Sequence, residues 1–192
     1  SEVSPTRRVP SHGTDLFGTT YALDFLVVDD DGRTAPARSL RTVFATEPPE
    51  LFYAFGRPLY SPIAGTVVSV HDGEPDHEAR RSILTLIPYG LSQPRRIRRG
   101  LTAVLGNHVI IQVAENPYYV GLVHLQRGSV QASPGDRVSA GDQIGRCGNS
   151  GNSTQPHLHI QAMDSPDPYA AKGVPLRFDE FQQHRPRQGA PW

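Results

Sequence analysis

The chain has 192 residues, which is enough for one domain with a sizeable hydrophobic core. Its 19 lysine and arginine residues balance 19 aspartate and glutamate residues, so the net charge gives no reason to expect a nucleic acid or an anionic membrane as the main partner. Eighteen glycines and 18 prolines favour a protein of strands and loops over a helix bundle. The single cysteine, Cys147, excludes an intramolecular disulfide, and no apolar run is long enough to cross a bilayer.

Short strands separated by turn residues recur along most of the chain. Residues 1–20 are polar and carry prolines and glycines, so we expect an irregular arm there. The charged segment 74–100 is expected to be an insertion, either a short helix or a loop, and the residues from 164 to 192 a C-terminal tail. Strands are expected at 21–28, at 57–73 with a turn at Gly65, and at 107–113, 118–125, 136–148 and 157–163. This pattern predicts one all-β domain over residues 1–192, with mainly antiparallel sheets forming an open groove, long loops and little helix.

Two histidines flank a single leucine in the segment PHLHI. Side chains alternate between the faces of a strand, so His157 and His159 point to one face and Leu158 to the other. Such a pair is either a solvated surface pair or part of a metal site. A catalytic zinc typically has three protein ligands, so a metal site would need further ligands from elsewhere in the chain.

Three further residues are candidates for such a site. Asp24 lies in the apolar segment ALDFLV, and burying a carboxylate is costly unless it is paired or bound to a metal. His12 precedes that segment, and His124 ends an apolar strand. Taken singly, Asp24 is better explained as a salt-bridged or amide-capping residue and His12 as a surface histidine, and His124 is also explained as a core histidine. Taken with His157 and His159, they form the set that a zinc hydrolase groove requires.

Several ordered blocks carry a family resemblance: SPIAGTVVSV, GNHVIIQV, YYVGLVHLQRGS and DRVSAGDQIGRCGNSGNSTQPHLHI. They resemble the lysostaphin-type zinc metallopeptidases, densely over residues 57–161 and more sparsely over 12–25. The resemblance implies one zinc ion per chain, with His12, Asp24 and His159 as its ligands. It also implies that the catalytic histidines, His124 and His157, flank the attacking water as general base and oxyanion partner, with the division of roles left open.

The resemblance further implies a zinc metalloendopeptidase that hydrolyses peptide bonds of bacterial peptidoglycan, in the stem peptide or the cross-bridge. The expected location is the cell envelope or the secreted fraction, the expected partners are peptidoglycan peptides and no nucleic acid, and the expected state is a monomer. The alternative is a non-catalytic peptidoglycan-binding or amidase-regulating domain on the same fold. Domains of that kind have lost metal ligands, whereas all five residues are present here.

Three features depart from the family pattern. Leu122 stands where a tyrosine is common, and Gln155 where a glycine is common. The spacing from His12 to Asp24 is longer than usual, which leaves Asp15 as a rival carboxylate ligand. We prefer Asp24 because YALDF predicts a strand. Cys147 lies near the predicted groove and is interpreted as structural, and surface or core positions are expected for the other histidines, His71, His77, His108 and His184.

Overall fold

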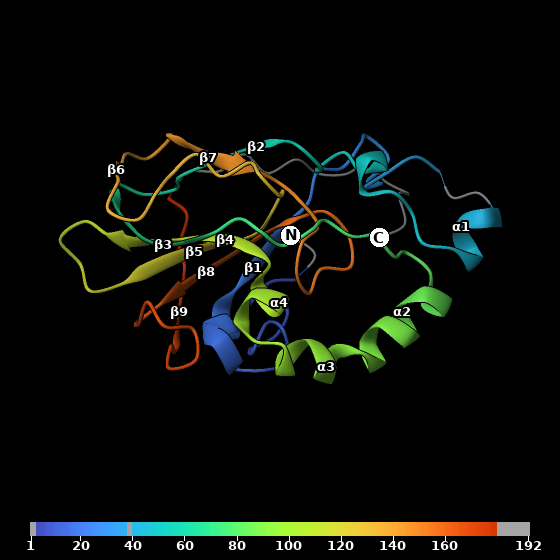
Figure 1. Cartoon of the computed structure of the whole chain (residues 1–192), viewed down its shortest axis with the longest axis horizontal. Helices are drawn as coiled ribbons and strands as arrows, with labels where there is room; N and C mark the ends of the chain where they lie inside the picture. Colours follow the sequence, from blue (N-terminus) through green and yellow to red (C-terminus); the bar gives the residue numbers. More distant parts are fainter. Residues whose placement is uncertain (1–2, 38–39, 180–192) are drawn as a thin grey trace.

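The computed structural model in Figure 1 describes residues 3–37 and 40–179. Two antiparallel sheets make up most of the fold, and the predicted all-β class is confirmed. The large sheet has the order β1-β8-β5-β4-β3-β6, with β9 added alongside β8, and the small sheet pairs β2 with β7. Their bounds are β1 (Leu23–Phe25), β2 (Pro58–Tyr60), β3 (Gly65–His71), β4 (Asn107–Val113), β5 (Tyr119–Leu125), β6 (Arg137–Val138), β7 (Gln143–Arg146), β8 (Leu158–Met163) and β9 (Gly173–Val174).

The charged insertion is helical from Ile83 onward, and its last helix ends beyond the predicted end at residue 100. Its helices are α2 (Ile83–Leu91), α3 (Gln93–Arg98) and α4 (Leu101–Leu105). Ser82 caps α2, because its hydroxyl accepts a hydrogen bond from the Leu84 amide. Short helical segments also occur elsewhere, as η1 (Leu16–Tyr21), α1 (Leu40–Phe44) and η2 (Pro49–Leu51). None of the described helices has the length and apolar composition needed to span a membrane.

The main hydrophobic core lies between the two sheets. Leu59 of β2 and Ile144 of β7 pack with apolar side chains from one face of the large sheet, which include Val109, Ile111, Val120, Leu122, Ile160 and Ala162. These strands carry many β-branched residues, which fit a pleated and buried surface. Figure 1 shows the small sheet lying over the large one.

Alternate side chains of strand β8 point to the opposite face of the large sheet. Ile160 and Ala162 face the main core, whereas Met163 packs in a separate cluster with Ile110. The segment η1 approaches this second face so closely that a Cβ on Gly18, which has φ +73°, would lie 2.8 Å from Met163 Cγ. The alternation therefore assigns His159 and Gln161 to the face that η1 covers.

The first strand is shorter than the predicted span 21–28. Tyr21 belongs to η1, and β1 pairs with β8 only from Leu23 to Phe25. Phe25 is paired with Leu158, the first residue of β8, so the chain after Phe25 has no further partner in this strand. The apolar residues after Phe25 had the composition of a strand but lack a neighbour to complete the ladder.

Candidate metal centre

Strand register places Asp24 directly opposite His159. These two residues are paired between β1 and β8, and Val123 of β5 is paired with His159 on the other side. Residues directly opposite each other in an antiparallel pair lie on the same face, with their Cβ atoms about 5 Å apart. The Asp24 carboxylate accordingly reaches the His159 ring, with Oδ1 at 3.0 Å from Nδ1.

His124 reaches the same place by breaking the alternation of β5. Regular alternation would put His124 on the core face with Leu122, which is fully buried in the main core. His124 instead has φ 64°, in the left-handed region that residues other than glycine rarely adopt. Its ring lies 4.9 Å from the His157 ring and 5.8 Å from the His159 ring, measured between centroids. Unusual backbone of this kind is frequent at functional sites.

The loop before β8 is held in place by close backbone packing. Gly106 (φ +65°) and Gly151 (φ +72°) adopt left-handed conformations against each other, and a Cβ on either one would overlap the facing backbone. His77 contacts the Gly151 carbonyl through Nε2 at 2.9 Å. The loop thereby presents the Ser150 carbonyl to the His124 ring, at 2.8 Å from Nδ1.

All five predicted residues converge on one point. His12 Nε2 lies 3.3 Å from Asp24 Oδ2, and His157 Nε2 lies 3.5 Å from Asp24 Oδ1. Two overlapping groups have their ligand atoms within 4.8 Å of one another: His12, Asp24 and His159, and also His124, His157 and His159. His159 belongs to both groups, so the geometry alone offers two sets of three ligands.

Hydrogen bonds fix the protonation of the first two rings. The Ser11 hydroxyl donates to the Thr19 carbonyl at 3.0 Å and lies 3.1 Å from His12 Nδ1, so this hydroxyl accepts the Nδ1 proton of His12. His124 Nδ1 faces a carbonyl, that of Ser150, and must also donate. When either ring carries one proton, the lone pair is therefore on Nε2.

The other two rings follow the same logic. His157 Nδ1 lies 2.8 Å from the Gln155 carbonyl and donates to it, which leaves the lone pair on Nε2. His159 is turned the other way: its Nε2 lies 2.8 Å from the Gln161 side-chain oxygen, and its lone pair is on Nδ1, toward Asp24. The Gln161 amide nitrogen donates to the Phe17 carbonyl at 2.6 Å, which leaves its oxygen for His159.

A metal cation would provide a partner for the lone pairs of this arrangement. Four ring nitrogens and a carboxylate present lone pairs to one another at short distances, and no proton of the neutral rings points into the space between them. Nitrogen and carboxylate oxygen atoms are the ligands that zinc accepts. The outward hydrogen bonds of the rings are of the kind that orient metal-binding histidines. The residues present therefore fit a zinc ion.

The surroundings of the site determine the protonation states of Asp24 and His124. Burial raises the pKa of Asp24, but hydrogen bonds from His12, His157 and His159 outweigh it and hold this pKa far below its usual range. With no cation bound, these hydrogen bonds require a proton on the ring nitrogens that face Asp24, and a bound cation would take the place of those protons. Complete burial, together with the neighbouring His157 and His159, lowers the pKa of His124 well below that of a free histidine. Asp24 is thus an anion and His124 a neutral base at neutral pH.

The remaining sequence candidates lie elsewhere. Asp15 is exposed and accepts a hydrogen bond from the Thr20 hydroxyl at 2.9 Å, so the rival carboxylate is not part of either group. Gln155 is occupied by the Thr34 hydroxyl, which donates to its side-chain oxygen at 2.8 Å. His71 and His108 stack on each other on β3 and β4, and His184 lies outside the described residues.

Sequence reasoning missed the groups that orient the histidines. Gln161 could have been predicted from the sequence, because it stands two residues after His159 on the same face of the same strand. Ser11 and the carbonyls of Ser150 and Gln155 have no comparable signal, since their contacts depend on how loops fold.

Cys147 is buried outside both groups of candidate ligands. Burial and the nearby Asp76 raise the pKa of its thiol to about 12, so the reactive thiolate is absent at ordinary pH. We expect iodoacetamide at mildly alkaline pH to leave Cys147 unmodified in the folded chain and to modify it fully in urea, as measured by intact mass. Rapid modification of the folded chain would show that Cys147 is accessible and would contradict its interpretation as structural.

The structure is thus that of a β protein with a candidate metal centre. Comparison with known proteins then points to a family. Residues 96–171 match the model of peptidase family M23, which confirms the resemblance to the lysostaphin-type peptidases. A 56-residue stretch is 41% identical to the peptidoglycan DD-endopeptidase ShyA of Vibrio cholerae serotype O1 (strain ATCC 39315 / El Tor Inaba N16961). That stretch is 29% of this chain and covers 12% of the length of the Vibrio protein.

Solved structures also resemble the chain at low identity. The catalytic domain of lysostaphin from Staphylococcus simulans is 20% identical with a TM-score of 0.41, over 68% of this chain and 84% of that one. The catalytic domain of the prophage-encoded M23 protein EnpA from Enterococcus faecalis, in a mutant form, is 24% identical with a TM-score of 0.41, over 74% of this chain and 94% of that one.

Proposed function

We propose that the chain is a zinc-dependent metalloendopeptidase that hydrolyses peptide bonds of bacterial peptidoglycan, in the stem peptide or the cross-bridge. The observation that carries the proposal is the convergence of four histidine lone pairs on the buried Asp24 carboxylate. The match to a peptidase family model supports a hydrolase, and the similarity to a peptidoglycan endopeptidase supports the substrate. Action on this substrate places the protein in the cell envelope or outside the cell.

In this proposal His12, Asp24 and His159 hold the zinc ion. Asp24 belongs to the set because it is a buried anion, and a cation bound against it compensates the cost of burying that charge. When bound, zinc supplies a water of lowered pKa and polarises the carbonyl of the peptide bond.

The other two histidines act on the reacting groups. Each presents Nε2 to the centre and is held by a hydrogen bond from Nδ1 to a backbone carbonyl. Because its pKa is low, His124 is unprotonated and available as a general base. Once protonated, either ring is able to donate a proton to the leaving amine or a hydrogen bond to the developing oxyanion.

Metal content is the direct test of this proposal. The purified chain should contain about one zinc per molecule by elemental analysis, and a His159→Ala variant should contain none, because His159 is common to both possible ligand sets. The parent should also release soluble peptides from purified peptidoglycan and lose this activity in a chelator.

The outcomes separate the enzyme from a binding domain on the same fold. Tyr118→Ser is a matched control, since Tyr118 is exposed and precedes β5 at the end opposite His124. If the parent holds no zinc even after loading with excess metal, the hydrolase proposal is wrong. If it holds zinc but releases no peptide from peptidoglycan of several cross-link types, the proposed substrate is wrong while the metal site stands.

A further inference from the structure

An apolar stripe on α2 is exposed to solvent. Ile83, Ile87 and Leu91 recur every four residues, so they lie along one side of the helix. These three side chains are 73%, 56% and 78% exposed, and Leu84 beside them is 54% exposed. The opposite side of α2 carries Tyr89, which is turned toward the loop before β8. Four large apolar side chains of a nine-residue helix are thus in water, which is unusual for a surface helix.

Helix α1 extends the exposed apolar surface. The two helices are in contact, and Figure 1 shows both at the same end of the molecule. Phe44 of α1 is 73% exposed. The exposed surface therefore comprises Phe44 together with the stripe on α2, and we call it the apolar ridge.

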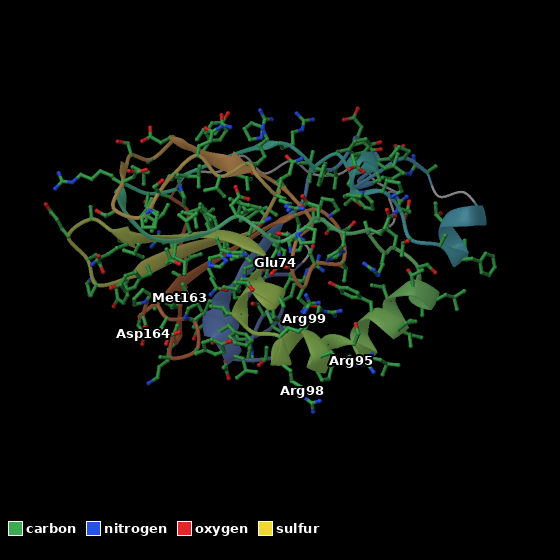
Figure 2. The ribbon with its side chains drawn as sticks, viewed as in Figure 1. Glu74, Arg95, Arg98, Arg99, Met163 and Asp164 are labelled. Carbon is green, nitrogen blue, oxygen red and sulfur yellow. The ribbon has the colours of Figure 1, made fainter. Side chains whose placement is uncertain are left out.

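The segment that contains α2 and α3 carries arginines and no acidic residue. Between Glu78 and Glu115 the sequence has no aspartate or glutamate but has six arginines, Arg80, Arg81, Arg95, Arg96, Arg98 and Arg99. The zero net charge of the whole chain conceals this local excess. Arg95 follows Leu91 by four residues, and Figure 2 shows Arg98 on α3 projecting away from the sheet.

Four of these six arginines fall into two groups. Arg96 lies 3.8 Å from the centre of the Tyr89 ring and donates to the Asn152 side chain at 3.0 Å, so it has a structural role. Arg81 forms an ion pair with Glu47. Arg95 and Arg98 are exposed, and among residues 3–37 and 40–179 neither lies in an ion pair. Their charges are therefore available to a partner.

We propose that the apolar ridge, with Arg95 and Arg98, docks the protein on an anionic lipid bilayer. A short amphipathic helix with arginines at its border is suited to the headgroup region, where apolar side chains enter the acyl boundary and arginines contact phosphates. A soluble polyanion would engage the arginines but would leave the apolar side chains in water. None of the residues of the apolar ridge is a candidate metal ligand.

Vesicle co-sedimentation tests the proposal. The chain should bind vesicles of phosphatidylglycerol and phosphatidylcholine, bind pure phosphatidylcholine vesicles far more weakly, and lose affinity as salt is raised. Arg95→Gln with Arg98→Gln should weaken binding about 25-fold, at about fivefold for each arginine. Ile87→Ser with Leu91→Ser should weaken it by at least about tenfold. These residues are exposed, so the variants should fold normally.

Matched controls and three outcomes make the test decisive. Arg137→Gln and Tyr118→Ser remove an exposed arginine and an exposed aromatic residue away from the ridge, and both should bind as the parent does. Failure of the parent to bind anionic vesicles overturns the proposal. The proposal is also wrong if soluble polyphosphate displaces the bound vesicles, the double arginine variant binds more weakly and the double serine variant binds as the parent does. That result would indicate a polyanion site. A dimer in solution that Leu91→Ser dissociates, without vesicle binding, would instead make the ridge an interface between two copies.

Discussion

Replacing His124 with alanine should leave the zinc content unchanged and slow peptidoglycan hydrolysis by about 10²- to 10⁴-fold, the usual contribution of a general acid or base. In the proposed function, His12, Asp24 and His159 make a complete ligand set without it.

Asp24→Asn should lose both zinc and activity, since it removes the negative charge and places an amide among the histidine lone pairs. Zinc affinity, measured by competition with a chromophoric chelator, should fall by more than about 100-fold, beyond the loss expected for a group that only orients a ligand.

The zinc content of His124→Ala, compared with that of His12→Ala, decides between the two ligand sets. If zinc instead binds His124, His157 and His159, the His124→Ala variant should lose the metal and His12→Ala should keep it. The unfolding temperature of each metal-free variant serves as the control, because it separates loss of a ligand from loss of the fold. Loss of zinc from His124→Ala with retention of zinc by His12→Ala would overturn the assignment of Asp24 and His12 as metal ligands, while leaving a zinc site in place.

The local part of the site could be predicted from the sequence because it follows from strand geometry. The shared face of His157 and His159 was predicted from the two-residue repeat of a strand. Strand β8 begins one residue later than predicted, yet both rings approach Asp24. The pairing of Asp24 with His159 joins β1 to β8, and no local pattern specifies which strands become neighbours. His124 shows the limit most clearly. Regular alternation assigns it to the core with Leu122, and only its left-handed backbone turns it toward the other histidines.

The helical insertion was predicted only in outline. Its arginines identified a charged surface segment, but Pro88 and Gly90 within α2 are residues that ordinarily interrupt helices, so they obscured the spacing of Ile83, Ile87 and Leu91. The helix forms because Ser82 caps its first turn and because Tyr89 is fixed by the Ser153 carbonyl and the Arg96 guanidinium. These tertiary contacts outweigh the weak local propensity.

Replacing Gln161 with leucine should weaken zinc binding by about 10- to 100-fold, the range for residues that orient a metal-binding histidine. Gln161 accepts a hydrogen bond from Nε2 of His159 at 2.8 Å, which leaves the lone pair on Nδ1. Leucine keeps the volume but accepts no hydrogen bond, so the His159 ring is free to adopt the other tautomer, with its proton on Nδ1 facing Asp24. Gln161→Glu should retain most of the affinity, because a carboxylate also accepts the Nε2 proton.

The control for this prediction is Met163→Leu, which alters the next residue on the same face of β8. This substitution removes the contact of the Gln161 amide nitrogen with Met163 Sδ but keeps the Gln161 oxygen that faces His159. A purely structural role for Gln161 would lower the stability of the metal-free chain in both leucine variants and leave zinc affinity alike in the two. A role in orienting His159 separates them, since only Gln161→Leu loses zinc affinity, and Gln161→Glu restores it. If Gln161→Leu binds zinc as tightly as the parent does, the bound metal itself selects the tautomer of His159, and the hydrogen bond to Gln161 follows from the ring position without determining it.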